Sequence, residues 1–468
     1  QQSVEERGGE GGGGGGGRGA GGERDPLLRC SPAPPLPRPL PILAPSVAPG
    51  DNPPMSSTIT PAVRQRLVAV IFIVSSLVAA GQVAFFTLLP IVAVDLSGSE
   101  SMAGVPSTLG LLFRAVATYP LGWLMGRAGR RPGLTIGLLF GVAGSALSAW
   151  AVGGGAFWLF AFGAGLGGVA RGAADLARYA AAEISPPDRR AKVIGWIVFA
   201  GTIGALAGPL LVTPAVNMAE RIGLTPESGP FWAAALVMAV STVLTFVLLR
   251  PDPLLISRLD DAPVADAVSE QPTRPLKSLL GLWPVRLGMA AMTIGQLVMV
   301  MIMVITPLHM DHVGHGTGAI SFVILAHQLG MFGLSGGVGW LIDRLGAAVV
   351  IVAGALLLVV ASLLSPFVVS VAGLSIALFL LGLGWNLCFV AGSALLAAGL
   401  APGERTHVQG LSDAGSSAAS ALGSLSTGPL FALGAMTLVS AVGLALSLAL
   451  VAAWVLSKNR VSAAKLGF

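Results

Sequence analysis

One apolar stretch of the sequence carries charged side chains whose spacing permits ion pairing and proton exchange. Asp175 follows Arg171 by four residues and precedes Arg178 by three, so the three side chains would share one face of a helix. A carboxylate in such a group can take up or release a proton as its solvation and its distance from the cations change. The group could instead be a structural salt-bridge network. Arg114, in another apolar stretch, is then either a partner of Asp175 or a group that attracts an anionic substrate.

Several uncharged polar residues also fall near the middle of apolar stretches, where polar groups usually face a protein interior or a water-filled cavity. His327 has a near-neutral ordinary pKa that suits a proton carrier, and a hydrogen-bonded packing histidine is the alternative. Amide and indole groups at similar depth could bind a neutral or amphipathic ligand, or could form hydrogen bonds between helices. These residues are Gln82, Gln296, Trp385 and Asn386.

The composition places these residues inside a membrane protein. Of the 468 residues, 54% are hydrophobic and only 10% are charged, whereas soluble domains contain about 25% charged residues. The apolar runs reach about 20 residues or more, the length that spans a bilayer as a helix. We therefore predict an all-α membrane protein with twelve transmembrane helices. Their expected ranges are 67–94, 103–125, 132–152, 156–182, 193–216, 230–249, 285–308, 318–342, 346–370, 373–399, 407–432 and 434–457.

The polar segments around these runs predict the domain organisation. The long, proline-rich connection at 250–284 divides the helices six and six, so it would link an N-terminal bundle at 67–249 to a C-terminal bundle at 285–457. The Gly-, Pro- and Arg-rich residues 1–54 are expected to be a disordered tail, either an extension or sequence upstream of a natural start at Met55. Residues 458–468 would form a short tail.

Lysine and arginine concentrate in alternate connections between the predicted helices. Such connections are usually cytoplasmic, because positively charged loops are retained on that side. This pattern predicts that both termini and the 250–284 linker are cytoplasmic, in an integral protein of the plasma (inner) membrane.

An internal repeat relates the two predicted bundles. Residues 122–129 read GWLMGRAG and residues 339–346 read GWLIDRLG, which match at five of eight positions. Each copy closes the second helix of its bundle. Two related six-helix halves would place a substrate site at their interface near the bilayer midplane.

These two segments resemble the signature loop of the major facilitator superfamily of secondary transporters. The resemblance implies twelve helices in two pseudo-symmetric bundles, a small-molecule substrate and alternating access. It also implies a gating role for the loop residues. These are Gly122, Arg127, Gly129, Arg130 and Arg131 in the first copy, and Gly339, Asp343, Arg344 and Gly346 in the second. The first copy has Gly126 where the family has the carboxylate that the second copy keeps as Asp343.

A second motif bears on the direction of transport. Gly204, Gly208 and Pro209 resemble the first part of the antiporter motif of the same superfamily, but Val212 and Thr213 stand in place of its last two glycines. The resemblance to the drug and proton antiporter branch favours proton-coupled efflux over uptake. A helix-packing groove is the alternative interpretation, because small residues four apart allow close helix contact.

Other function classes are disfavoured. The chain has no phosphate-binding loop of the ATP-dependent pumps, no nucleophile triad, no basic patch with aromatic platforms for nucleic acid, and no expected metal site or cofactor. We therefore predict a non-enzymatic carrier, expected to be monomeric, whose partners are a small molecule, protons and the lipid bilayer. The alternatives are a proton-coupled uptake carrier and a non-transporting membrane sensor on the same scaffold.

Overall fold

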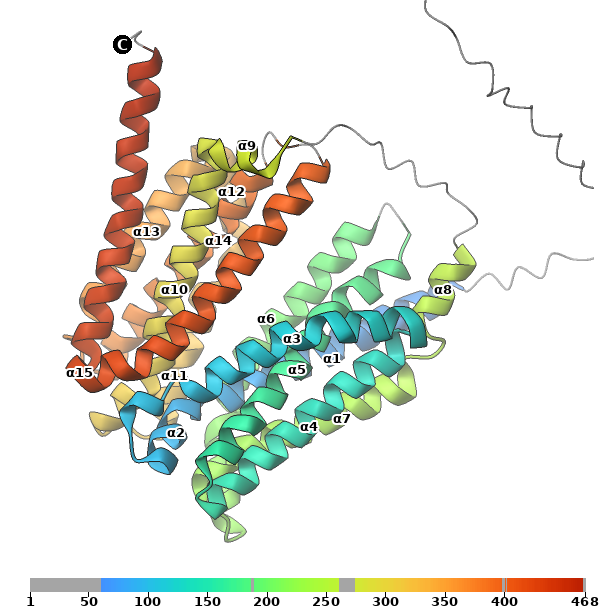
Figure 1. Ribbon diagram of the computed structural model, residues 1–468. Helices are drawn as coiled ribbons and strands as arrows, with labels where there is room; N and C mark the ends of the chain where they lie inside the picture. Colours follow the sequence, from blue (N-terminus) through green and yellow to red (C-terminus); the bar gives the residue numbers. More distant parts are fainter. Residues whose placement is uncertain (1–59, 187–188, 261–273, 398–399, 401, 466–468) are drawn as a thin grey trace, which may run out of the picture. The chain divides into compact units, whose positions relative to one another are not determined.

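The computed structural model describes residues 60–186, 189–260, 274–397, 400 and 402–465. The predicted all-helical class is confirmed, since the elements of these residues are α-helices with short 3₁₀ and π segments and include no strand. The expected N-terminal tail lies outside the described residues. The helices α1 to α7 gather in one bundle and α10 to α15 in another (Figure 1).

The first bundle contains seven α-helices and two short 3₁₀ helices. In chain order they are α1 (Pro61–Thr87), α2 (Leu89–Ser97), η1 (Glu100–Met102), α3 (Val105–Ala128), α4 (Arg130–Gly154), α5 (Phe157–Glu183), α6 (Arg190–Arg221), η3 (Pro226–Ser228) and α7 (Gly229–Leu248). Prolines stand in the first turn of α1, α3 and α7, where a missing backbone N–H costs nothing. Gly129 separates α3 from α4 with φ 112° and ψ 157°, a conformation that an L side chain rarely adopts.

The connection and the second bundle follow. They comprise α8 (Pro253–Asp260), α9 (Leu276–Gly281), α10 (Trp283–His312), α11 (Thr317–Gln328), the π-helix η4 (Leu329–Gly333), α12 (Ser335–Leu345), α13 (Ala347–Leu364), α14 (Val371–Ala397) and α15 (Pro402–Lys465). The backbone of α15 leaves helical geometry at Gly434 and Ala435, at the boundary expected between the last two membrane helices. The helix then continues beyond residue 457 to Lys465.

Within the described residues, nine helices are long and apolar enough to cross a membrane, or ten when the bent segment from α11 to α12 counts as one span. Two features separate this number from twelve. The kinked α15 is one helix in this count but covers two expected spans, and α3, which contains Arg114 and Arg127, is not among the nine. The number twelve therefore stays a prediction.

The two bundles repeat the same packing. The contacts of α1 with α6, α4 with α5, and α3 with α5 recur as α10 with α15, α13 with α14, and α11 with α14. Between the bundles, α3 contacts α15 and α6 contacts α11, which are again equivalent pairs. The side chains repeat as well, because the guanidinium of Arg127 lies 5.4 Å from the ring of Trp123 and that of Arg344 lies 5.0 Å from Trp340.

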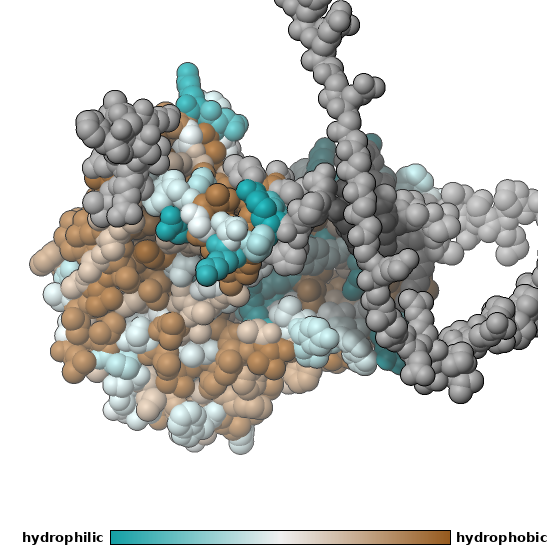
Figure 2. Space-filling view, turned by 45° about the horizontal axis from the view of Figure 1, so that its top comes forward, coloured by the Kyte–Doolittle hydropathy of each residue, from teal (hydrophilic) through white to brown (hydrophobic). Residues whose placement is uncertain are grey.

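The outer surface of the bundles is apolar, as a lipid-facing surface must be. Figure 2 shows hydrophobic side chains spread over much of one face. Large exposed apolar residues include Leu139, Phe140, Trp150, Leu236, Val243 and Phe246 on α4 and α7, and Leu356, Leu363 and Leu433 on α13 and α15.

The bundles touch closely through small residues near η1, at what we call the η1 end. The hydroxyl groups of Ser107 in α3 and Ser424 in α15 form a hydrogen bond, and Ser424 also donates to the Gly104 carbonyl at 3.0 Å. A methyl group on Gly104 would overlap the carbonyl oxygen of Ser424. Any residue larger than glycine at position 104 would therefore disrupt this contact between the two halves.

Candidate functional site

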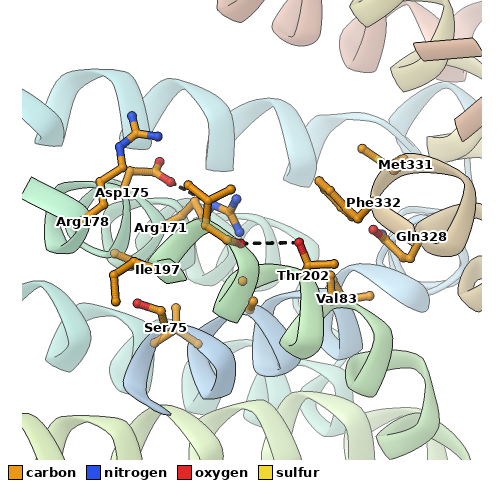
Figure 3. A pocket seen from close by; sticks show the side chains of 16 residues that line it. Ser75, Val83, Arg171, Asp175, Arg178, Ile197, Thr202, Gln328, Met331 and Phe332 are labelled. Atoms are coloured by element: carbon orange, nitrogen blue, oxygen red, sulfur yellow. Dashed lines mark hydrogen bonds and ion pairs between the residues drawn. The ribbon is translucent and has the colours of Figure 1, made fainter. Parts of the chain in front are cut away.

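A cavity of about 310 Å³ is lined by α1, α5, α6 and the end of α11 with η4. Arg171, Asp175 and Arg178 of α5 lie on one wall, as their spacing predicts (Figure 3). Gln328, at the end of α11, lies on the opposite side of the same view. The predicted charged group thus lines a cavity to which both halves of the molecule contribute.

Asp175 binds two arginines, one of them from a different helix. Its carboxylate lies 2.7 Å from the Arg114 guanidinium of α3 and 3.4 Å from Nε of Arg171. The structural pair between Arg114 and Asp175 is therefore present, although the Arg114 side chain remains 43% exposed. Arg178 stacks on Tyr179 at 5.0 Å and forms no ion pair within the described part of the chain.

A second cavity, of about 220 Å³, lies beside the first and shares Val83, Gln328 and Met331 with it. Its walls are mostly apolar and come from both halves. The polar side chains among its lining residues are Ser107, His327, Gln328 and Ser424.

His327 is fully buried in the wall of this second cavity. Its Nδ1 lies 2.9 Å from the carbonyl oxygen of Leu378, which accepts a hydrogen bond only if Nδ1 carries the proton. The neutral ring then presents Nε2 as an acceptor, and Nε2 has no hydrogen-bond partner among the described residues. Both the proton-carrier and the packing interpretations of His327 stay open.

The helix that carries His327 and Gln328 changes geometry directly after them. The π-helix η4 contains Met331 and Phe332, and the segment Thr317–Gly333, which includes η4, is bent by 50° relative to Gly337–Leu345. Local π geometry occurs frequently at functional sites, because it interrupts the regular helix and re-aims side chains. Met331 of this π-helix lines both cavities, and Phe332 lines the larger one.

The other polar residues predicted for the cavity form hydrogen bonds inside their own bundles. Gln82 donates to the Gly167 carbonyl at 3.0 Å, and the Trp385 indole donates to Oε1 of Gln296 at 2.7 Å. Gln296 in turn donates to Ser420, and Asn386 donates to Ser335. None of Gln82, Gln296, Trp385 and Asn386 is among the lining residues of the two large cavities, which favours the interhelical interpretation.

The antiporter-like glycines lie where α6 crosses α1. A methyl group on Gly204 would overlap the Ser76 carbonyl, and one on Gly208 would lie 2.7 Å from the Ala80 carbonyl. These glycines allow the close approach of the two helices that form a wall of the larger cavity.

The two signature loops lie at the opposite end of the helices from η1, at what we call the signature-loop end. In the first copy, Arg130 forms hydrogen bonds through its guanidinium with Glu183, one of them at 2.8 Å. The Asp252 carboxylate accepts the backbone N–H groups of Arg130 at 3.0 Å and Arg131 at 2.9 Å. In the second copy, Asp343 is exposed and has no hydrogen bond or ion pair in the described structure.

The apolar wall of the second cavity is formed by residues that were not predicted from the sequence. Met299, Val300, Met303 and Val304 of α10 line it. Their spacing of one, four and five residues places them on one face of a helix, and this pattern was a usable signal. It is weak in a membrane helix because the lipid-facing side is equally apolar.

No metal centre is apparent in the part of the chain that the structure describes, where no group of three or more His, Cys, Asp or Glu side chains could hold an ion. His309 and His312 belong to the last turn of α10, and His315 follows the helix. His312 lies 3.8 Å from Glu100 of the other half, and His315 lies 2.6 Å from the Val369 carbonyl.

Comparison with known proteins gives a consistent family. The family model described as Major Facilitator Superfamily matches residues 71–424. The uncharacterized MFS-type transporter YdeG of Bacillus subtilis (strain 168) is 34% identical over 397 residues, which cover 81% of this chain and 89% of YdeG. The riboflavin transporter RfnT of Brucella anthropi is 26% identical over 349 residues, 75% of this chain and 85% of RfnT.

Solved structures share the fold at low identity. The nucleoside transporter NupG superposes with a TM-score of 0.62 at 16% identity, over 83% of this chain and 99% of that one. A D-xylose-proton symporter gives 0.61 at 17% identity, over 83% and 96% of the two chains.

Proposed function

The chain belongs to the Major Facilitator Superfamily, and we propose that it carries a small molecule out of the cell in exchange for protons, by alternating access. It is a secondary transporter embedded in a membrane and not an enzyme. The observation that supports a central substrate site is the cavity to which α1, α5 and α6 of one half and Gln328 of the other contribute. The close contact of Ser107 with Ser424 supports a gate at the η1 end.

Asp175 is the coupling residue that we propose, ahead of His327. A coupling group must change its surroundings between the two states, so that its protonation shifts the conformational equilibrium. Asp175 binds one arginine from its own helix and one from α3, and a shift of α3 against α5 would change this charge environment. His327 has a backbone carbonyl as its hydrogen-bond partner, which does not discriminate between states by charge.

Efflux is the direction that the antiporter-like glycines of α6 favour. Proton-coupled uptake is the second candidate, and the excess of arginine in the cavity favours it for an anionic substrate. Protonation of Asp175 would raise the positive charge of the site, so a proton and an anion would bind together and move in the same direction.

We further propose that both termini and the signature-loop end are cytoplasmic in the plasma membrane, and that the protein acts as a monomer. The positive residues of the signature loops support this orientation. Under it, the molecule is closed on the outer side, where Ser107 meets Ser424.

Proteoliposomes with an imposed pH gradient test the function. The substrate screen should begin with riboflavin, because the related protein RfnT is named as a riboflavin transporter. Exchange predicts that a proton gradient drives the substrate against the direction of proton flow, whereas uptake predicts movement with the protons.

In Asp175→Asn, gradient-driven transport should be lost while passive exchange persists, and His327→Gln is the matched test. Retained uphill transport in Asp175→Asn, with loss in His327→Gln, would reverse the assignment. Ligand binding without flux would instead indicate a sensor.

A further inference from the structure

The two large cavities are adjacent and have opposite chemical character. Val83, Gln328 and Met331 belong to the walls of both. The larger cavity carries the charged group of α5, and the smaller carries an apolar wall from α10. A ligand that extends from one to the other therefore meets charge at one end and hydrocarbon at the other.

The charged end has more positive than negative groups. Arg114 and Arg171 share the single carboxylate of Asp175, and Arg178 forms no ion pair within the described residues. Asp413 of α15 interacts electrostatically with Arg178 without forming an ion pair, so three guanidinium groups and two carboxylates leave a formal excess of one positive charge. Unbalanced charge at membrane depth is costly, and a bound anion would offset it. Guanidinium groups also match the geometry of carboxylate and phosphate oxygens.

The apolar end is suited to a ring or a hydrocarbon body. Met299, Met303 and Met331 line it, together with Phe86 and Leu111. Methionine side chains are flexible and polarizable, so they adapt to irregular apolar shapes and contact aromatic rings favourably. The wall thus tolerates a range of apolar groups.

One polar group between these ends has no hydrogen-bond partner among the described residues. The Gln328 amide lines both cavities and forms no hydrogen bond there. Nε2 of His327 also has no partner in the described structure, but it is occluded behind the wall of the apolar cavity. Buried polar groups are normally hydrogen-bonded, so the Gln328 amide indicates a position where a ligand can complete the bonding.

We propose that the substrate is an amphipathic organic anion, with a carboxylate or phosphate held by Arg171 and Arg178 and an apolar, ring-containing body in the methionine-lined cavity. The ligand passes Gln328, whose amide forms a hydrogen bond with a polar atom of the ligand. This inference rests on the proposed transport function and names its substrate class.

Binding of three probes of the same shape tests the charge preference. Naphthylacetate, naphthylacetamide and naphthylethylammonium carry the same ring system with negative, neutral and positive end groups. With the purified full chain in lipid nanodiscs, naphthylacetate should bind at least about tenfold more tightly than the amide, the difference expected for a charge-assisted hydrogen bond. The ammonium compound should bind most weakly.

Variants test which end of the site provides the charge preference and which end binds the ring. Arg171→Gln and Arg178→Gln should each reduce naphthylacetate affinity about tenfold and leave the amide unchanged, and the retained amide binding shows that the variant is folded. Met303→Gln should weaken both compounds and keep their ratio. Arg286→Gln removes an exposed arginine of α10 that lines neither cavity, so it should preserve both affinities.

Several results would overturn the proposal. They are equal affinity for the carboxylate and the amide, a preference for the ammonium compound, no saturable binding of naphthylacetate, or a charge preference that survives in both arginine variants. Flux measurements separate this failure from failure of the transport function. Flux of a neutral compound without charge preference would remove the anion proposal and leave the transporter. Selective anion binding without flux of any probe would support the ligand class and contradict transport.

Discussion

The two copies of the signature loop share a backbone and differ in how they are held. Gly129 and Gly346 both adopt positive φ, at 112° and 84°, with ψ values of 157° and 145°. Each loop also follows an arginine stacked on a tryptophan one helical turn earlier. The internal repeat is thus present in backbone dihedral angles and side-chain contacts as well as in the amino-acid sequence.

The loop between α3 and α4 is held by hydrogen bonds to other residues of the N-terminal half. The Asp252 carboxylate caps the start of α4 through the N–H groups of Arg130 and Arg131, and it also accepts the N–H of Leu254 at 2.8 Å. The Arg130 pair with Glu183 of α5 adds a second anchor. In the loop between α12 and α13, the described carboxylate Asp343 has no partner.

From this difference we propose different tasks for the two loops. The first loop would stabilise one half as a unit. The second loop would use its carboxylate to contact the other half when the signature-loop end closes. A negative charge at a helix N-terminus is favourable, and the start of α6 is such a position.

Alanine substitution of the two loop glycines should give the largest difference in stability between the loops. In Gly129→Ala, the new methyl group would lie 2.5 Å from an Asp252 carboxylate oxygen, in addition to the strained backbone. In Gly346→Ala nothing lies within 4 Å, so only the strain remains. Strain of this kind costs about 1 to 3 kcal/mol. We expect both variants to lower the thermal-denaturation midpoint, and Gly129→Ala to lower it further. Equal shifts would show that the Asp252 contact is not important.

Removal of the two carboxylates should have different consequences. Asp252→Ala takes away an N-terminal cap of α4, and loss of such a cap costs about 1 to 2 kcal/mol of stability. Asp343→Asn should leave the denaturation midpoint unchanged and reduce transport, because its partner is expected only in the other conformational state. If Asp343→Asn transports normally, the gating role of the second loop is wrong.

The ion pair between Arg130 and Glu183 can be measured with a double-mutant cycle of Arg130→Gln and Glu183→Gln. The two side chains are 19% and 30% exposed, so solvent screens them partly and we expect a coupling of about 0.5 to 1 kcal/mol. A cycle with Asp343→Asn in place of Glu183→Gln is the control and should give no coupling.

Gly126→Asp should make the first loop more like the second, with the smallest energetic effect. A methyl group on Gly126 would meet nothing within 4 Å, so the fold can accommodate a side chain. The added carboxylate should strengthen closure of the signature-loop end by about 0.3 to 1 kcal/mol, the range for a charge at a helix terminus. Labelling of single cysteines in the larger cavity should become slower. Unchanged labelling together with unchanged transport would contradict this expectation.

Much of the fold and part of the site could be predicted because the relevant signals are local. The charged face of α5 follows from the spacing of Arg171, Asp175 and Arg178, and the loop repeat follows from matching letters. The break in α15 falls at the expected boundary near residue 433. For Gln296 and Trp385, in contrast, the sequence left open a ligand-binding role and an interhelical hydrogen bond, and in the structure the two side chains bind each other at 2.7 Å. The sequence predicts the depth of these two residues in the membrane, but it does not predict the direction in which their side chains point.

The sequence by itself determined the membrane class, the helical secondary structure and the relationship between the halves, because these depend on the length of apolar runs and on repeated short segments. Only the tertiary structure decided that Arg114 reaches Asp175, that Asp252 caps α4, and that the methionines of α10 form a cavity wall. These contacts join residues far apart in the chain, and they depend on how each helix is rotated about its axis. In a soluble protein the polar face of a helix would reveal that rotation. In a bilayer both faces are apolar, so the rotation becomes visible only when the helices are packed together.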